Sequence, residues 1–302
     1  MRSRASTPGL ALPLAPARAI DLFDLTKPRL TLLVLLTTVA GYAVGAEGGA
    51  FAWERLLAVV GGTFLVVGGA NALNQFLERV TDRLMTRTAR RPLPDGRLPA
   101  GTAVWFGSLA SVLGVGLLAV WVNPETAGLA VLAWGLYVFV YTPMKRRSPW
   151  STIVGAIPGA VPALMGWAGA QGRLPVEGWV LFGVVFCWQV PHFMAIAWRY
   201  RHEYAAAGFP VLPVADPSGR RTGRQAVWYS LLLLPVSLLP VVLGWAGAGY
   251  GWGALGLGAL YLGASLVFAR DRGPRPTRWL FVTSLIYLPA LWALMMADRY
   301  LF

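Results

Sequence analysis

Residues 56–91 read LLAVVGGTFLVVGGANALNQFLERVTDRLMTRTARR, and the stretch changes character abruptly at position 78. The run from Leu56 to Leu77 carries no charged side chain. It is long enough to cross a bilayer, because a membrane-spanning helix needs roughly 20 mostly apolar residues. The next fourteen residues hold seven charges, two acidic and five basic. The stretch therefore predicts a membrane helix that ends in a charged segment.

The whole chain has the composition of a membrane protein. Hydrophobic residues make up 56% of its 302 residues, charged residues make up only 13%, and the mean hydropathy is +0.57. A soluble chain of this length is rarely so apolar. We predict an all-α, polytopic bundle of nine transmembrane helices, at about residues 30–46, 56–77, 101–122, 126–143, 150–170, 178–198, 226–246, 248–269 and 279–297.

The distribution of basic residues among the segments between the helices provides an independent test of the nine-helix count. The N-terminal segment and the segments after the second, fourth, sixth and eighth windows together hold 23 of the 26 Lys and Arg residues. Because cytoplasmic segments are enriched in basic residues, we predict a multi-pass protein of the bacterial cytoplasmic membrane, with its N-terminus in the cytoplasm and its C-terminus outside. Topology and attraction to anionic lipids account for the net charge of +13. No nucleic-acid partner is predicted.

The domain organisation follows from the same windows. Residues 1–24 are predicted to form a largely disordered cytoplasmic arm, and residues 25–302 a single nine-helix domain. Two cytoplasmic segments, 78–100 and 199–225, are long and carry acidic residues among the basic ones. We expect these two cap loops to lie opposite one another over a shared cavity.

Three oxygen-bearing side chains mark the end of the second window. Asn74, Glu78 and Asp82 follow one another at intervals of four residues and therefore lie along one face of a helix. Mg²⁺ prefers oxygen ligands and is usually held by one or two carboxylates together with substrate phosphates. The arginines that follow, Arg87 and Arg91 among them, have the planar fork of donors that suits phosphate oxygens. The pattern favours a lipid diphosphate held through a metal ion.

A second interpretation of this stripe remains open. Glu78 and Asp82 also fit ordinary helix-end charges paired with Arg79 and Arg83, since such surface pairs are common and weak. Asn74 favours a site, because it lies one turn deeper in apolar sequence, where an amide needs a partner.

Four stretches of the sequence resemble the UbiA-type intramembrane prenyltransferases. They are the run from Asn74 to Leu93, LTKPRL at 25–30, YTPMKRRSPWSTIVGAIPGAVPALMGWAGA at 141–170, and WQVPHFMAIAWRYRHEYAAAGFPVLPV at 188–214. The first run is similar to the polar motif of the superfamily. The others, Pro191-His192-Phe193 above all, are similar to the branch that farnesylates haem. The resemblance spans nearly all of residues 25–297.

The resemblance implies a bundle with a lateral opening to lipid and a Mg²⁺-dependent transfer of the farnesyl group of farnesyl diphosphate to a vinyl group of haem B, giving haem O. A haem A synthase-type protein is implied as an acceptor of the product. The implied metal ligands are Asn74, Glu78, Asp82 and Glu203, the only acid in a stretch where the superfamily usually carries two aspartates. The implied diphosphate contacts are Arg87, Arg91, Lys145, Arg199 and Arg201. The implied catalytic residues are Asn74, Glu78, Asp82, Lys145, Tyr141 and His192, with His192, Trp188 and Trp198 against haem.

Alternatives remain for these residues and for the function. Tyr141 and Lys145 also fit an interfacial tyrosine and a topology-setting lysine, and His192 also fits a packing residue. A related prenyltransferase acting on a quinone or chlorin precursor would share the donor site. A secondary transporter would also carry intramembrane polar groups, but the ionisable residues here gather toward one membrane face.

Overall fold

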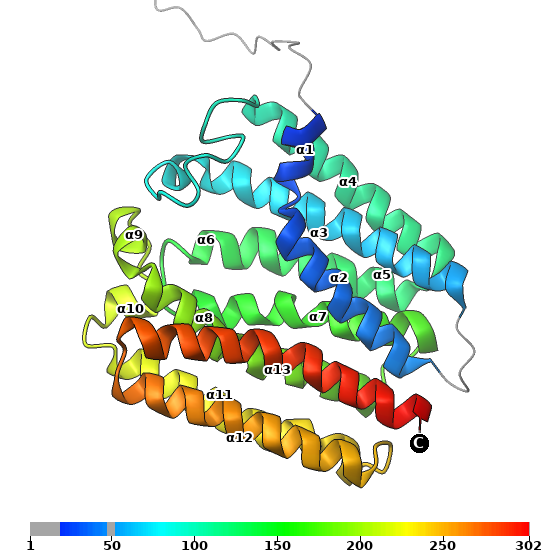
Figure 1. Ribbon diagram of the computed structural model, residues 1–302. Coiled ribbons are helices and arrows are strands. Elements are labelled where there is room, and N and C mark those ends of the chain that lie inside the picture. Colours follow the sequence, from blue (N-terminus) through cyan, green and yellow to red (C-terminus); the bar gives the residue numbers. More distant parts are fainter. Residues whose placement is uncertain (1–18, 47–51, 302) are drawn as a thin grey trace, which may run out of the picture.

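The structure is a computed structural model that describes residues 19–46 and 52–301 (Figure 1). Within these residues all regular structure is helical, and nine segments are long and apolar enough to cross a membrane. They are α2 (Pro28–Gly45), α3 (Trp53–Asp82), α4 (Ala100–Trp121), the continuous run from α5 to α6 (Pro124–Met144), α7 (Ser151–Gln171), α8 (Val176–Arg199), α11 (Arg220–Val242), α12 (Ala248–Arg270) and α13 (Pro274–Leu301). The predicted nine-helix fold is confirmed.

Short elements complete the chain. The run Pro124–Met144 consists of α5 (Pro124–Gly135), a π-helical turn η2 (Leu136–Tyr141) and α6 (Thr142–Met144), and α9 (Arg201–Ala206) and α10 (Leu212–Ala215) follow α8. Residues Ala19–Leu25, most of which were assigned to the predicted N-terminal arm, form helix α1. In this helix Asp21 is buried and pairs with Arg97. Residues 1–18 of the predicted arm lie outside the described residues.

Local sequence explains where several helices begin and end. Pro28 and Pro124 open α2 and α5, where a missing backbone N–H costs nothing. The Asn123 side chain accepts a hydrogen bond from the Thr126 N–H and so caps α5. At the other end of α7, Gly172 adopts a φ of 67°, a left-handed conformation that glycine reaches without strain.

Small residues let α2 and α7 pack backbone to backbone. Gly41 of α2 faces the Ala163 carbonyl, and Gly166 of α7 faces the Thr38 carbonyl, with no room for a Cβ atom at either glycine. Close approach through glycine is a common way for membrane helices to associate, since lipid offers no hydrophobic drive between them. This contact fixes α2 against the centre of the bundle.

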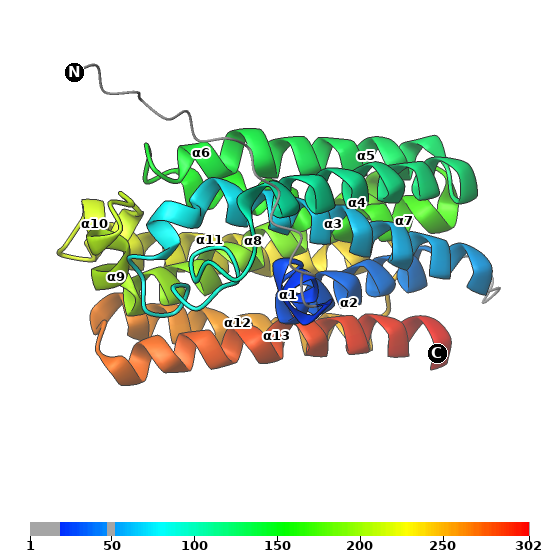
Figure 2. The same ribbon diagram turned by 90° about the horizontal axis from the view of Figure 1, so that it is seen from above.

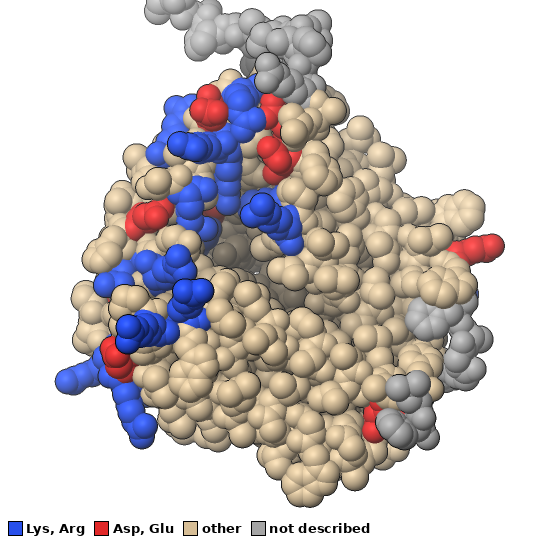
Figure 3. Space-filling model, in the orientation of Figure 1, with Lys and Arg blue, Asp and Glu red and all other residues tan. Residues whose placement is uncertain are grey.

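The two cap loops meet at one end of the bundle. Met85, from the segment after α3, packs with Tyr204, Phe209 and Val211 from the segment after α8. Figures 1 and 2 show α9 and α10 at the same end as the segment that follows α3. Lys and Arg side chains gather at this end, and a hollow opens beside them between α2 and α13 (Figure 3). The two cap loops therefore contact one another, as expected, and the shared cavity beneath them stays a prediction.

Candidate functional site

The carboxylates at the end of α3 are buried. Asn74, Glu78 and Asp82 are 1%, 2% and 0% exposed. Helix α3 has 30 residues and is therefore about 45 Å long, which exceeds the roughly 30 Å hydrocarbon core. Its last turns can therefore reach the level of the head groups while remaining covered by protein.

The nearby arginines at the end of α3, Arg79 and Arg83, are not the partners of this stripe. The Arg79 guanidinium donates to the Phe76 carbonyl at 2.7 Å, and the Arg83 Nε donates to the Pro94 carbonyl at 2.9 Å. The interpretation of Glu78 and Asp82 as ordinary helix-end charges paired with Arg79 and Arg83 is therefore wrong. Buried charges need partners, and here the partners come from elsewhere in the chain.

Each member of the stripe has one cation from a different segment. Lys145 Nζ lies 2.9 and 3.0 Å from the two carboxylate oxygens of Glu78. The Arg91 guanidinium lies 2.7 Å from Asp82 Oδ2. Lys27 Nζ donates to Asn74 Oδ1 at 2.7 Å. Three basic side chains and three oxygen-bearing side chains thus form one cluster beneath the cap loops.

Sequence reasoning missed Lys27 as a site residue. This lysine stands just before Pro28 and has φ 51° and ψ 65°, a left-handed conformation that is unusual for a residue other than glycine. Such strain persists only where the surroundings enforce it and is common at functional sites. Burial of the amine, together with the nearby Arg91, lowers the pKa of Lys27 to about 7. The signal in the sequence was the Lys-Pro pair, which also fits a topology-setting residue.

Lys145 is the second basic residue that contacts the stripe, through the Glu78 carboxylate. Burial alone would lower the pKa of Lys145, but the Glu78 carboxylate outweighs burial and raises it above the usual range. The amine also lies 5.1 Å from the Phe209 ring centroid and 5.8 Å from that of Tyr141. It is therefore held as a cation between an acid and two aromatic faces.

The π-helical turn places aromatic rings beside Lys145. The rings of Tyr137 and Tyr141 have centroids 5.3 Å apart, and the Tyr141 ring rests on Gly155 of α7. In the next turn, Thr142 Oγ1 accepts a hydrogen bond from Asn74 Nδ2 at 3.1 Å. Single π-helical turns are rare in proteins, and those that occur are often found at functional sites. This one joins the aromatic pair to the stripe on α3.

The second cap loop reaches the first through Arg87. Its guanidinium donates to the Tyr204 hydroxyl at 2.8 Å, and its backbone N–H donates to Glu203 Oε2 at 3.4 Å. The two predicted diphosphate residues of the second cap loop, Arg199 and Arg201, contact aromatic rings instead. Arg201 donates to the Trp198 carbonyl and lies over the Trp198 ring, and Arg199 lies over the Tyr200 ring.

His192 faces α13. Its Nδ1 lies 2.7 Å from Ser284 Oγ, and its ring stacks against Trp188 at 5.1 Å and Phe281 at 5.2 Å between centroids. Trp188 Nε1 donates to the Ser284 carbonyl at 2.8 Å. Ser284 and Phe281 were not found from the sequence, because nothing marks them within an ordinary apolar helix.

Trp198 is placed apart from the other predicted haem contacts. Its Nε1 donates to the Arg272 carbonyl at 2.7 Å, and its ring is covered by Arg201, Arg272 and Gly219. The structure therefore sets it at the base of α11 and α13, more than a turn of α8 beyond His192.

Comparison with known proteins identifies the family to which this chain belongs. A model of the UbiA prenyltransferase family matches residues 34–297 of this sequence. The chain belongs to the UbiA prenyltransferase family. It is 47% identical over 288 residues to the protoheme IX farnesyltransferase of Solibacter usitatus (strain Ellin6076), which covers 92% of this chain and 98% of that protein. The resemblance seen in the sequence is thus confirmed, including its haem-farnesylating branch.

Solved structures of UbiA-type proteins share the fold. A digeranylgeranylglyceryl phosphate synthase structure has a TM-score of 0.79 at 17% identity, covering 94% of this chain and 99% of that one. A UbiA homolog from Archaeoglobus fulgidus bound to DMAPP and Mg²⁺ has a TM-score of 0.68 at 15% identity, covering 91% and 99%. At these identities the likeness concerns the fold alone.

The donor set of this UbiA-family site fits a magnesium ion. Within the described chain no three His, Cys, Asp or Glu side chains are grouped as a metal site, so Glu203 does not join Glu78 and Asp82. The stripe itself offers two carboxylates and one amide, all oxygen donors. Asp82 Oδ1 is buried and has no hydrogen-bond partner among the described residues. A buried carboxylate oxygen without a partner is costly. Such an oxygen is a suitable ligand for a hard cation.

Proposed function

We propose that this protein transfers the farnesyl group of farnesyl diphosphate to a vinyl group of haem B, producing haem O. One structural observation carries the donor half of the proposal, namely the buried stripe of Asn74, Glu78 and Asp82 held by three basic side chains beneath the cap loops. The acceptor half rests on the 47% identical relative, a protoheme IX farnesyltransferase.

The stripe would hold the diphosphate through Mg²⁺. Asn74, Glu78 and Asp82 are the proposed ligands, and the UbiA homolog bound to DMAPP and Mg²⁺ supports this choice of ion. When bound, Mg²⁺ would neutralise negative charge on the diphosphate oxygens. We do not include Glu203 in this set, because its carboxylate contacts the backbone of Arg87.

The chain's own cations would stabilise the leaving group. Lys27, Lys145 and Arg91 already face the stripe, and Arg87 lies at the junction of the two loops. The positive charges of Lys145 and the arginines are fixed before the reaction, which is the arrangement that stabilises developing negative charge most effectively. Arg199 and Arg201 are held at aromatic faces in the second loop and would serve, at most, as outer contacts.

Aromatic rings would protect the cationic fragment. Cleavage of the C–O bond leaves the electron pair with the diphosphate and an allylic cation on the farnesyl chain. Tyr141, which the π-helical turn sets beside Lys145, would shield such a cation through its ring face. The vinyl π electrons of haem B would then form the new C–C bond, and water would add to the resulting cation with loss of a proton.

The cluster on α8 and α13 is the proposed haem contact. His192 is fixed by Ser284 and lies between two aromatic rings, one of which is Trp188. A flat macrocycle suits such surroundings, and a neutral imidazole can bind haem iron. Trp198 would act only indirectly, because its indole contacts the α12–α13 link.

We further propose that the protein resides in a bacterial cytoplasmic membrane with its basic end, the cap loops and the donor site in the cytoplasm. Farnesyl diphosphate and haem B would enter through the hollow between α2 and α13, which Figure 3 shows beside the basic end. A haem A synthase-type protein would receive the product.

A competition between acceptors tests this function. The purified protein would be given farnesyl diphosphate and Mg²⁺ with an equimolar mixture of haem B and a quinone precursor, and both products would be followed by mass spectrometry. We expect a haem product heavier by one farnesyl group and one hydroxyl group. Prenylation of the quinone alone would overturn the haem assignment in favour of the related prenyltransferase.

A further inference from the structure

A second pocket lies at the opposite end of the bundle from the stripe. It has a volume of about 170 Å³ and is formed by the link between α7 and α8, the segment after α11 and the last turn of α13. A single water needs on the order of 10–15 Å³ measured in this way. The pocket is therefore large enough for a small polar group with several waters.

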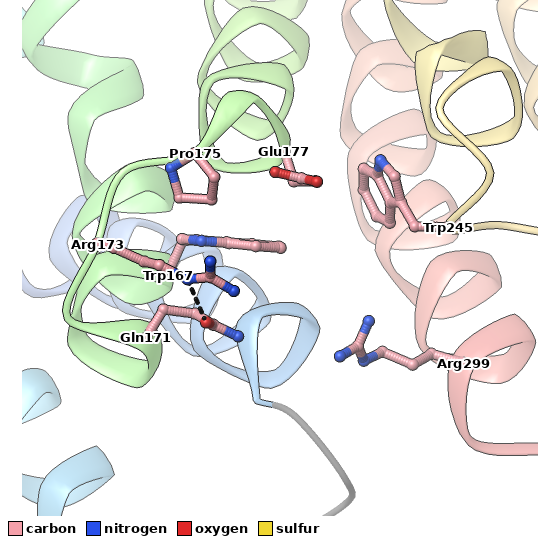
Figure 4. Close-up of a pocket in the computed structure, with 7 residues that line it drawn as sticks. All are labelled: Trp167, Gln171, Arg173, Pro175, Glu177, Trp245 and Arg299. Carbon is pink, nitrogen blue, oxygen red and sulfur yellow. Dashed lines mark hydrogen bonds between the residues drawn. The ribbon is translucent and has the colours of Figure 1, made fainter.

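Three charged side chains line this pocket. Figure 4 shows the guanidinium groups of Arg173 and Arg299 approaching from two sides, with the Glu177 carboxylate across from them. The Arg299 guanidinium suits an anion, and the Glu177 carboxylate suits an ammonium or a hydroxyl group.

The pocket also holds polar atoms without partners. Trp167 is only 5% exposed, yet its Nε1 has no hydrogen-bond partner among the described residues. Trp245 Nε1 and Glu177 Oε2 also have no hydrogen-bond partner in that part of the chain. These three atoms belong to side chains that line the pocket beside its arginines. Buried polar atoms usually have partners, so these three indicate a ligand with both acceptors and a donor.

We propose that this pocket binds the head group of a phospholipid that carries a hydrogen-bond donor, either an ammonium or a hydroxyl group, beyond its phosphate. The phosphate would accept from Arg299 and Trp167, and the ammonium or hydroxyl group would donate to Glu177. The pocket lies at the ends of membrane helices, the level at which head groups are found. This site is separate from the donor and acceptor sites proposed above.

The position of Arg299 gives the bound lipid a structural role. Arg299 also donates to the Ala46 carbonyl at 2.9 Å, and the neighbouring Tyr300 hydroxyl donates to the Ala43 carbonyl at 2.7 Å. These bonds fasten α13 to α2 at the end away from the hollow. A lipid phosphate on Arg299 would therefore sit where the two helices that flank the hollow are joined.

Native mass spectrometry of the purified full chain tests the proposal. Phosphatidylethanolamine, phosphatidylglycerol and phosphatidylcholine with matched acyl chains would be added separately, because choline cannot donate a hydrogen bond. We expect the first two to be retained at least about tenfold better than the third, as for the loss of one hydrogen bond to a charged group. Arg299→Gln should reduce their retention by a similar factor, while Arg278→Gln, an exposed arginine near the other end of α13, should not.

Two further variants keep the test decisive if Arg299→Gln does not fold. Trp167→Phe keeps an aromatic ring and removes the N–H, and should weaken retention of both lipids. Glu177→Met removes the acceptor and should abolish the preference over phosphatidylcholine. Equal retention of all three lipids by the wild-type chain, or unchanged retention in these variants, would overturn the proposal. Displacement of the lipids by millimolar inorganic phosphate would overturn it too, and would assign the pocket to a free phosphate ion.

Discussion

The Lys145 ammonium lies within 3.0 Å of both carboxylate oxygens of Glu78, although 67 positions separate the two residues in the sequence. The pair joins α3 to the end of the α5–α6 segment in largely buried surroundings, with side-chain exposures of 14% for Lys145 and 3% for Glu78. Breaking a buried ion pair by removing one partner leaves an uncompensated charge and typically costs about 3–5 kcal/mol. This relationship is therefore both structural and, in the proposed function, catalytic.

A double variant separates the two roles of this pair. Glu78→Gln and Lys145→Met should each lower the melting temperature, because each leaves one buried charge alone. The combination Glu78→Gln with Lys145→Met should recover most of the stability, since no isolated charge remains. Its prenyl transfer should stay at least about 100-fold below wild type, because the groups that stabilise the leaving diphosphate are gone. Recovery of activity along with stability would show that the pair is only structural.

Lys27 should act on the donor. Lys27→Met removes the amine that contacts Asn74 Oδ1 and should raise the KM for farnesyl diphosphate by about tenfold, the effect of one hydrogen bond to a charged group. Steady-state kinetics with haem at saturation would measure this change. Arg29→Gln, two residues away at an exposed position, is the matched control and should behave as wild type. Equal KM values for Lys27→Met and Arg29→Gln would remove Lys27 from the site.

Gly155 should control the position of Tyr141. A Cβ atom at Gly155 would lie 2.5 Å from the Tyr141 ring, so Gly155→Ala should push the ring out of place. A misplacement of about 1 Å can cost roughly a hundredfold in rate, and we expect kcat to fall while the protein still folds. Gly128→Ala, on α5 with open space around it, should leave kcat unchanged. A normal kcat for Gly155→Ala would mean that Tyr141 has no role in catalysis.

His192 should affect the acceptor and not the donor. His192→Ala should weaken haem binding, followed by a titration of the Soret band, and Ser284→Ala should do so to a smaller degree because it frees the imidazole without removing it. Binding of farnesyl diphosphate should be nearly unchanged in both. His202→Ala provides the control, since this second histidine is exposed in the cap loop. Normal haem binding by His192→Ala would return His192 to a packing role.

The membrane spans could be predicted from the sequence because their signal is local. Length and hydropathy alone define each window, and the sorting of basic residues checks the count independently. Helix α1 was not predicted, because it is too short to form such a window. It has only seven residues, and its buried Asp21 is matched by Arg97, which lies far away in the sequence.

The composition of the site was predictable only in part. The spacing of Asn74, Glu78 and Asp82 identified the stripe, since one helix carries all three. Their partners could not be derived from spacing, because Lys27 and Lys145 lie in segments far from α3 in the sequence. Local pairing with Arg79 and Arg83 looked equally reasonable, and only the three-dimensional structure shows those arginines bound to carbonyl groups. A single lysine before a proline carries no signal that distinguishes a site residue from a topological one.

The central claim is that the stripe on α3 holds a diphosphate through Mg²⁺, and calorimetric binding of farnesyl thiodiphosphate tests it most directly. This unreactive analogue would be titrated into wild type and Asp82→Asn, each with Mg²⁺ and with EDTA. Asp82→Asn keeps the size of the side chain and removes the charge of a carboxylate whose Oδ1 has no partner in the described part of the chain. We predict Mg²⁺-dependent binding by wild type and at least about tenfold weaker, Mg²⁺-insensitive binding by the variant. Equally tight, Mg²⁺-dependent binding by both proteins would contradict the assignment.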